Sequence, residues 1–390
     1  MNNEKKGLNI SAKSFVTAIA IIFVLMVLTY GLTFAVADGL PFWKWILSPI
    51  LVLGTEDSGS VLTIIAFLLV IGGIFNSLEK SGWLKYILDQ ITWRYGKNRK
   101  ILLAVVTLFF MLLGSFIGLY EESIPLVPIV VALAVRLGWD VLTGLGMSLL
   151  AIGCGFAAGV CNPFTVGVAQ ELAGLPMFSG VWLRAFSFVI IYAGLMIFLY
   201  RHANKVAKPL EMLEIQEQYR ASIPVVKMKE LVVTFWNGIV SVIPAIFMIL
   251  MANSIKYTLV EAGALDIILN RAILIAQNLP GWSVILFVYL IVLVMNFFIP
   301  SGSAKAFLLM PLIVPVAHAF DISAQLCVMA FAFGDGFSNV FYPTNPVLLI
   351  ALGLADMDYG TWAKWSIKYQ IVNLVLTALI LLFGLAIGYA

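Results

Sequence analysis

The chain has 390 residues, of which 62% are hydrophobic and 11% are charged, and its formal net charge is +3. Soluble domains are about half apolar and about a quarter charged, so this composition excludes a mainly soluble protein and predicts a polytopic membrane protein. The three cysteines and two histidines show no metal-ligand spacing. The small basic excess is spread over the loops and gives no reason to expect a nucleic acid partner.

The first element that we expect is a transmembrane helix within residues 1–37, where lysines precede an apolar run long enough for a crossing of about 20 residues. The basic N-terminus is expected in the cytoplasm. Residues 38–58 then form an outside loop with an aromatic interfacial anchor, and a helix over 59–79 returns. Residues 80–100 combine basic residues with tryptophans, which predicts an amphipathic helix on the inner face.

The segment 101–137 has two interpretations. Its apolar arms flank Glu121 and Glu122. As two full crossings, the arms would place these acids in an outside loop. As a re-entrant hairpin, both ends stay cytoplasmic and the acids lie at the tip. The second arm contains Pro125 and Pro128 and is short for a crossing, and the internal repeat described below favours the hairpin.

A broken helix is expected over 141–173, because Asn162-Pro163 interrupts an apolar segment there. A helix over 183–200 then returns to the inside. The linker 201–230 is the longest polar stretch of the chain, and its basic excess predicts a cytoplasmic location. It marks the boundary between two halves.

The second half is expected to begin inside with a helix over 231–252. A sparsely basic segment over 255–280 then lies outside. A second hairpin over 281–320 enters from that side, with Ser301 at its tip. A broken helix over 323–355 and a last helix over 365–389 complete the chain.

Backbone-breaking residues recur at nearly the same separation in the two halves. The separations are 183, 181 and 183 residues for Pro128 with Pro311, Gly153 with Gly334 and Asn162 with Asn345. Paired interruptions of this kind are typical of secondary transporters built from repeats. We therefore assign repeat 1 to residues 38–200 and repeat 2 to residues 231–390. Each repeat has three crossings and one hairpin. Because the number of crossings is odd, the second repeat is expected to have the opposite orientation in the membrane to the first.

Several motifs carry a resemblance to a known family. They are residues 114–125, 162–170, 173–180, 300–303 and 333–339. Over most of residues 60–390 the chain resembles the YfcC-like family of the C4-dicarboxylate anaerobic carrier (DcuC-like) group, within the ion transporter superfamily. The resemblance implies a homodimeric carrier in which a transport domain moves against a scaffold, an elevator mechanism. The family names suggest basic amino acids or C4-dicarboxylates as substrates.

The fold that we predict is therefore all-α: an inverted-repeat, elevator-type transporter with two re-entrant helical hairpins and two broken transmembrane helices. Non-helical backbone at membrane depth needs partners, and ionisable residues there are functional by default. We expect the hairpin tips and breaks to form the binding site. Its candidate residues are Ser115, Glu121, Glu122, Ser123, Asn162, Pro163, Thr165, Ser301, Gly302, Ser303, Lys305, Asp335, Asn339, Thr344 and Asn345.

Each candidate also has a structural interpretation. Asn162 and Asn345 could cap half-helices, and Asp335 could satisfy backbone donors at the second break. Lys305 could pair with an acid across the site. A further basic residue, Arg184, is interpreted as an interfacial anchor. No cofactor and no metal are expected, apart from a coupling Na⁺ near the two asparagines and the hairpin tips, or a coupling H⁺.

The acids at the expected site outnumber Lys305, its one fixed cation. This balance favours a basic or zwitterionic amino acid, moved across a bacterial inner membrane by ion coupling or exchange. A C4-dicarboxylate or another small carboxylate is the alternative, and a channel is the second. We expect no enzyme, because neither Asp335 nor His318 has the partner that an intramembrane protease needs. The expected partners are the substrate, the bilayer and a second copy of the chain.

Overall fold

The computed structural model describes residues 12–55, 58–208 and 228–390, and no strand occurs among them. The basic start of the chain and most of the 201–230 linker lie outside the described residues, and so do Glu56 and Asp57. The predicted location of that linker therefore stays a prediction.

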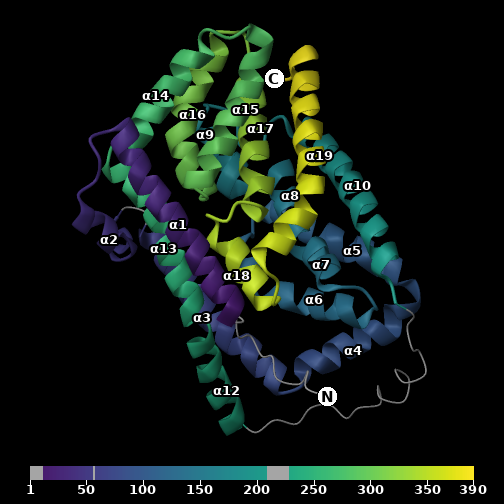
Figure 1. Cartoon of the computed structure of the whole chain (residues 1–390). Coiled ribbons are helices and arrows are strands. Elements are labelled where there is room, and N and C mark those ends of the chain that lie inside the picture. Colours follow the sequence, from purple (N-terminus) through teal and green to yellow (C-terminus); the bar gives the residue numbers. More distant parts are fainter. Residues whose placement is uncertain (1–11, 56–57, 209–227) are drawn as a thin grey trace.

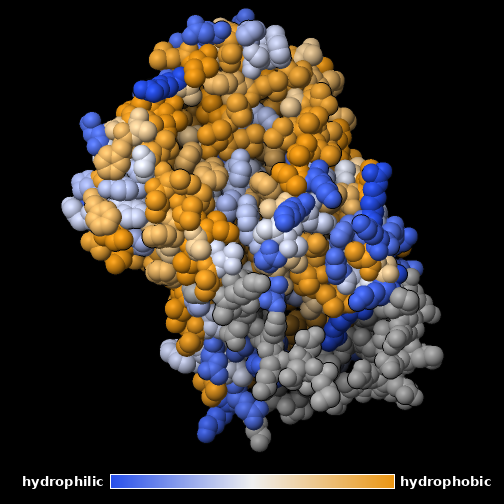
Figure 2. Space-filling view, viewed as in Figure 1, coloured by the Kyte–Doolittle hydropathy of each residue, from blue (hydrophilic) through white to orange (hydrophobic). Residues whose placement is uncertain are grey.

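Eight described helical segments are long and apolar enough to cross a membrane by length and composition. They are Val16–Val36, Val61–Lys80, Arg99–Ile117, Val141–Leu172, Val181–Val206, Lys229–Glu261, Gly281–Phe298 and Tyr359–Ala386. The face shown in Figure 2 is largely hydrophobic, as a lipid-facing surface requires. The chain is an all-α polytopic membrane protein, as its composition predicts. The eight segments include the first arm of each predicted hairpin but not the second broken helix over 323–355, so they number one more than the seven crossings that we expected.

Four helices form one side of the molecule (Figure 1). Helix α3 (Ser58–Lys80) packs along α12 (Met228–Ser241), and α1 (Ala12–Val36) packs along α13 (Ile243–Glu261). The predicted single helix over 231–252 is divided at Val242, because a proline in the first turn of α13 cannot donate to the preceding turn. Helix α13 then continues to Glu261, well into the segment that we expected to lie outside.

Small residues let α3 and α12 approach closely. A Cβ added at Gly238 would overlap the backbone oxygen of Gly72, so the two helices touch through their main chains. One helical turn away, Asn76 donates a hydrogen bond to the backbone oxygen of Thr234 at 2.6 Å.

The segment 38–58 that we expected to lie outside is helical in part, and its location stays a prediction. Helix α2 (Phe42–Leu51) and the 3-10 turn Val52–Gly54 occupy it. Trp45 is buried, and its indole nitrogen donates to the backbone oxygen of Met26 at 3.2 Å, whereas Phe42 and Trp43 are exposed. Of these three aromatic residues of the expected anchor, only Trp45 therefore packs on α1.

Two short helices occupy matching positions in the halves. Helix α4 (Trp83–Tyr95) follows Gly82 and α14 (Ala264–Ala276) follows Gly263; both helices have 13 residues. Both glycines are left-handed, with φ of 82° and 65°, a conformation that favours glycine. Helix α4 is the amphipathic helix expected over 80–100, whereas α14 was not expected.

The segment 99–137 doubles back on itself. Helix α5 (Arg99–Leu112) continues as a π-helical turn, Leu113–Ile117, and α6 (Leu126–Arg136) returns. Arg99 Nη1 donates to the backbone oxygen of Leu137 at 3.0 Å, which joins the two ends.

The segment 281–320 doubles back in the same way. It consists of α15 (Gly281–Phe298) and α16 (Gly302–His318). A Cβ at Gly281 would lie 3.6 Å from the ring of Phe320, so this hairpin is also closed at its base.

Both predicted broken helices are present. The first comprises α7 (Val141–Leu145), a π-helical turn (Gly146–Leu150) and α8 (Ala151–Ala158), and after the break η6 (Pro163–Gly167) and α9 (Val168–Leu172). The second comprises α17 (Ala324–Gly336), η7 (Phe337–Val340) and α18 (Pro346–Leu354). The long helices α10 (Val181–Val206) and α19 (Tyr359–Ala386) follow the broken helices.

The recurring glycines allow each hairpin to pack against the broken helix that follows it. A Cβ at Gly155 would overlap the backbone oxygen of Met111 in the first hairpin. A Cβ at Gly334 would lie 2.7 Å from Val292 in the second. Both broken helices are almost entirely buried, which places the two breaks at the centre of the molecule.

A polar contact holds the base of the first hairpin near α10. Asp140 caps α7 by accepting from the backbone and side chain of Thr143 at 2.9 and 2.6 Å, and His202 Nε2 lies 2.9 Å from its other oxygen. Trp365 donates to His202 Nδ1 at 3.1 Å, so His202 Nε2 carries the proton that Asp140 accepts.

Replacing Gly238 by leucine should force α3 away from α12. We expect a loss of about 1–3 kcal/mol or more from overpacking, measured as a lower melting temperature in detergent. Gly31→Leu in α1 is the matched control, because no atom lies within 4 Å of a Cβ there. Equal melting of the two variants would contradict a close α3–α12 contact.

Acid should weaken the base of the first hairpin. Partial burial tends to raise the pKa of Asp140, but the hydrogen bonds from His202 and Thr143 outweigh it and hold the pKa below its usual range. The contact therefore stabilises the fold fully above the ordinary aspartate pKa of about 4, and less as the pH falls through the lower folded value. Asp140→Asn should show a smaller loss of melting temperature between about pH 6 and pH 3. An unchanged acid dependence would contradict this assignment.

Candidate functional site

A buried ion pair joins the second hairpin to the second broken helix. Lys305 Nζ lies 2.5 Å from Asp335 Oδ1, and neither side chain is exposed. Lys305 lies in the first turn of α16 and Asp335 in the last turn of α17. Each charge therefore sits at the end of a helix whose dipole disfavours it, so each depends on the other for stabilisation.

Every donor of the Lys305 ammonium is used. Besides Asp335, it donates to the backbone oxygen of Ile299 at 3.2 Å and to the side-chain oxygen of Asn296. An ammonium has three donors, so three oxygens satisfy it. Ile299 lies at the hairpin tip just beyond α15, and its carbonyl is among those that the end of a helix leaves free.

Asn296 is a central residue that our sequence analysis missed. Its amide nitrogen lies 3.0 Å from the backbone oxygen of Asp335, 2.6 Å from Ser338 Oγ and 3.0 Å from Asn339 Oδ1. The available signal was that it is the one side-chain amide in the apolar sequence of α15. A lone polar group in such a segment indicates an internal partner.

The second break is held together by amides. Asn345 caps α18 by accepting from the backbone nitrogen of Val347 at 2.9 Å, and its own amide donates to Asn339 Oδ1 at 3.0 Å. The Tyr120 hydroxyl, from the tip of the first hairpin, donates to the backbone oxygen of Asn339 at 3.0 Å. The tip of one hairpin thus contacts the break of the other repeat.

The first break has a matching cap. Asn162 Oδ1 accepts from the backbone nitrogens of Phe164 and Thr165 at 2.9 and 3.3 Å. Ser115 Oγ in the first hairpin accepts from the backbone nitrogen of Val160 at 3.0 Å. Both asparagines are therefore caps, the role that a structural interpretation assigned to them.

Arg184 is not the interfacial anchor that we expected. It is fully buried, and it donates to the backbone oxygens of Val160 and Ser179 at 3.3 and 2.8 Å. A cation is favoured there because the carbonyl groups at the end of α8 have lost their helical partners. The sequence pattern misled us because Arg184 lies close to the start of its helix.

The tip of the second hairpin also touches the first break. A Cβ at Gly302 would overlap the methyl group of Thr165 and lie 2.9 Å from Asp335 Oδ2. Within the described chain, Thr165 Oγ1 and Asp335 Oδ2 are buried without a hydrogen-bond partner. Thr344 Oγ1 has the same status at the second break. Thr165 of the first repeat and Asp335 of the second thus both lie against Gly302 at the tip of the second hairpin.

The remaining candidates lie at the rim or stabilise turns. Glu121 is half-buried and interacts electrostatically with Asp335, whereas Glu122 is exposed. Ser123 is buried and donates to the backbone oxygen of Tyr120 at 2.7 Å, closing the turn. The others are an exposed Ser301, a half-buried Ser303 and an exposed Pro163.

This architecture has counterparts among known proteins. A family model described as C4-dicarboxylate anaerobic carrier (DcuC) matches residues 47–227 and 221–386 of the chain. The chain belongs to this family. The resemblance to YfcC-like proteins that we inferred from the motifs is confirmed.

Two curated proteins and one solved structure are similar to this chain. YfcC of Escherichia coli K12 is 26% identical over 399 residues, covering 85% of this chain and 79% of its own, and its name provisionally describes a basic amino acid antiporter. An uncharacterised Haemophilus influenzae protein is 21% identical over 371 residues, covering 80% of this chain and 73% of its own. The YdaH transporter of Alcanivorax borkumensis shares the fold, with a TM-score of 0.50 at 12% identity over 95% of this chain and 99% of YdaH.

The Lys305–Asp335 pair should behave as one energetic unit. Lys305→Met or Asp335→Asn alone should each lower the free energy of unfolding by about 3–5 kcal/mol. Each substitution leaves a buried charge without its opposite charge, or leaves buried polar groups without a hydrogen-bond partner. The double variant should cost much less than the sum of the two. Reversible unfolding in mixed micelles measures this coupling. Additive effects would show that the pair is not coupled.

Proposed function

We propose that this protein is a secondary transporter of a basic or zwitterionic amino acid in the bacterial inner membrane, working by ion coupling or exchange. Membership of the DcuC family supports the function of a carrier. The proposal that the substrate is an amino acid rests on one observation, the charge that remains at the site once Lys305 and Asp335 have paired.

That remaining charge is acidic. Lys305 and Asp335 neutralise each other, and the ammonium has no donor left for a substrate carboxylate in this conformation. Glu121 and Glu122 then remain at the tip of the first hairpin, and Glu121 interacts electrostatically with Asp335. In a low-dielectric site, unbalanced carboxylates favour an ammonium group over a dianion.

An elevator mechanism is part of the proposal. Helix α6 has 11 residues and would span about 16 Å, too short for a hydrocarbon core of about 30 Å, which supports a re-entrant hairpin. The corresponding glycines, short helices, hairpins and caps of the two halves support inverted repeats over 38–200 and 231–390. We propose the hairpins and broken helices as the moving domain, and α1, α3, α12 and α13 as the scaffold of a homodimer.

The coupling ion that we propose is Na⁺ or H⁺. Thr165 Oγ1 and Asp335 Oδ2 fit Na⁺ in chemistry, since both are buried oxygens that lack a described partner. A proton would instead be carried by Glu121, a half-buried carboxylate that interacts electrostatically with Asp335. No other cofactor is proposed.

Counterflow in proteoliposomes tests the substrate. Lysine, arginine or a neutral amino acid should exchange with its labelled form. Glu121→Gln should raise KM about tenfold or more, since a charge-assisted hydrogen bond contributes about 1.5–3 kcal/mol. Glu171→Gln, an exposed carboxylate of α9, is the matched control and should leave KM unchanged.

Other results would decide for the alternatives. Succinate or fumarate counterflow that survives Glu121→Gln and Glu122→Gln, with no amino acid response, would favour the dicarboxylate reading that the family description suggests. Flux that neither saturates nor shows counterflow would favour a channel.

A further inference from the structure

The last long helix, α19, buries polar side chains and exposes apolar ones. It packs against α10, α15 and α17 (Figure 1). Ile371, Val372 and Val375 are more than half exposed. The buried side chains of three successive turns recur every three or four residues and therefore share one face, which we call the polar face of α19. They are Ser366, Tyr369, Gln370, Asn373 and Thr377. At membrane depth, such a face needs polar partners inside the protein.

Part of the polar face has partners. Gln370 Nε2 donates to the backbone oxygen of Phe337 at 3.2 Å. The hydroxyl groups of Thr377 and Tyr289 share a hydrogen bond of 2.8 Å. Phe337 begins η7, directly after α17 ends. Gln370 therefore ties the polar face to the second break.

The rest of the polar face lacks such partners. Among the described residues, eight buried side-chain nitrogen or oxygen atoms have no hydrogen-bond partner in the protein, and four of them lie on this face. They are Ser366 Oγ, Gln370 Oε1, Asn373 Oδ1 and Asn373 Nδ2. Ser366 and Asn373 are fully buried, and Gln370 is 5% exposed. Because a buried polar atom without a partner is costly, this concentration of open atoms indicates a bound polar ligand.

The chemistry of the open atoms decides which ligand fits. Asn373 leaves both a donor and an acceptor open, and Gln370 leaves an acceptor. A cation would satisfy the oxygens and leave the Asn373 nitrogen open, and an anion would do the reverse. Water both donates and accepts, and a buried water makes about three hydrogen bonds to groups of this kind.

The spacing of the open atoms requires more than one water molecule. Ser366 and Asn373 are seven residues apart, which is about 10 Å along a helix. One water that bridges two groups spans about 5–6 Å, because each of its hydrogen bonds is about 2.8 Å long.

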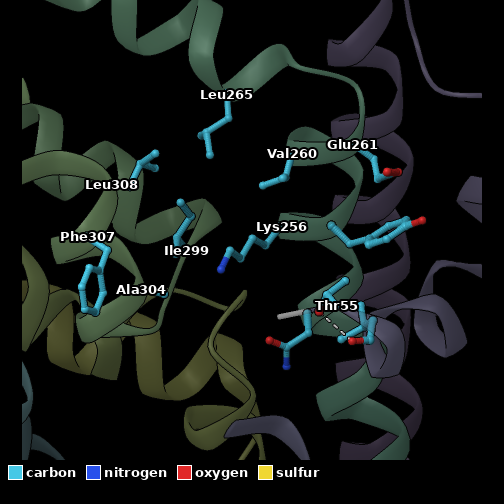
Figure 3. A pocket seen from close by; sticks show the side chains of 12 residues that line it. Thr55, Lys256, Val260, Glu261, Leu265, Ile299, Ala304, Phe307 and Leu308 are labelled. Atoms are coloured by element: carbon cyan, nitrogen blue, oxygen red, sulfur yellow. Dashed lines mark hydrogen bonds between the residues drawn. The ribbon is translucent and has the colours of Figure 1, made fainter. Parts of the chain in front are cut away.

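The polar face is separate from the cavity shown in Figure 3. That cavity, of about 570 Å³, lies between α13 and the tip of the second hairpin, and no residue of α19 is among its described lining residues. None of the candidate substrate-binding residues belongs to α19 either. The open atoms of α19 therefore need an explanation of their own.

We propose that the polar face of α19 binds a cluster of two or more ordered water molecules, held by Ser366, Gln370 and Asn373. A water on Gln370 Oε1 fixes the orientation of the amide that holds the Phe337 carbonyl, so the cluster supports the second break. The proposal is independent of the proposed function, because the presence of water does not depend on what is transported.

Radiolytic hydroxyl labelling of the purified full-length protein, read by mass spectrometry, tests the cluster. Ordered water near a side chain becomes the source of the label under a brief X-ray pulse. Tyr369 is only 2% exposed and lies one turn from both Ser366 and Asn373, so its labelling reports internal water. Asn373→Leu should lower this labelling several-fold, since leucine makes no hydrogen bond to water. Asn278→Leu, at an exposed asparagine after α14, is the matched control and should leave the labelling unchanged.

A second variant guards against misfolding. Ser366→Ala removes one open atom with little change in size, so it should fold normally and lower the labelling of the buried Trp362, one turn away. Asn373→Leu should also lower the melting temperature, because its waters lose a partner. A dry face predicts a higher melting temperature instead, because leucine would then remove an amide that has no partner.

Three results would overturn the cluster. They are no labelling of Tyr369 in the unmodified protein, equal labelling of Tyr369 in the Asn373→Leu and Asn278→Leu proteins, and a higher melting temperature of Asn373→Leu. Because neither measurement involves transport, a failure of counterflow would count against the proposed function and not against this cluster.

Discussion

The structure depends on one buried ion pair. Lys305 and Asp335 are both fully buried, and an isolated charge in such a place would cost several kcal/mol. The pair is tolerated because Asn296 and the free carbonyl of Ile299 complete the shell of the ammonium. Satisfying these groups requires the tip of the second hairpin, the end of α15 and the end of α17 to meet at one point.

That requirement organises the surrounding polar network. Asn296 extends the contact to Ser338 and Asn339, and Asn339 links it to the cap of α18 and to Tyr120 of the first hairpin. Each hairpin tip thus contacts the break of the opposite repeat. A displacement of one hairpin would leave buried polar atoms of both repeats without partners, which favours movement of the two hairpins as a unit.

The same geometry separates two kinds of charge. The central pair is neutral as a whole and sealed from solvent, whereas Glu121 at the first hairpin is only half-buried. A carboxylate that is not fully buried favours an ammonium group over an anion.

The sequence by itself determined the membrane class, both hairpins, both breaks and the family, because apolar runs and proline or glycine interruptions are local signals that act through the chain's own backbone. Asn162 and Asn345 were likewise predictable as caps, since the capping hydrogen bonds that their side-chain oxygens accept come from their own helices. Tertiary structure alone decided the roles of Asn296 and Arg184. Their partners lie on other elements, at Asp335 and Val160, and no local pattern specifies such long-range contacts.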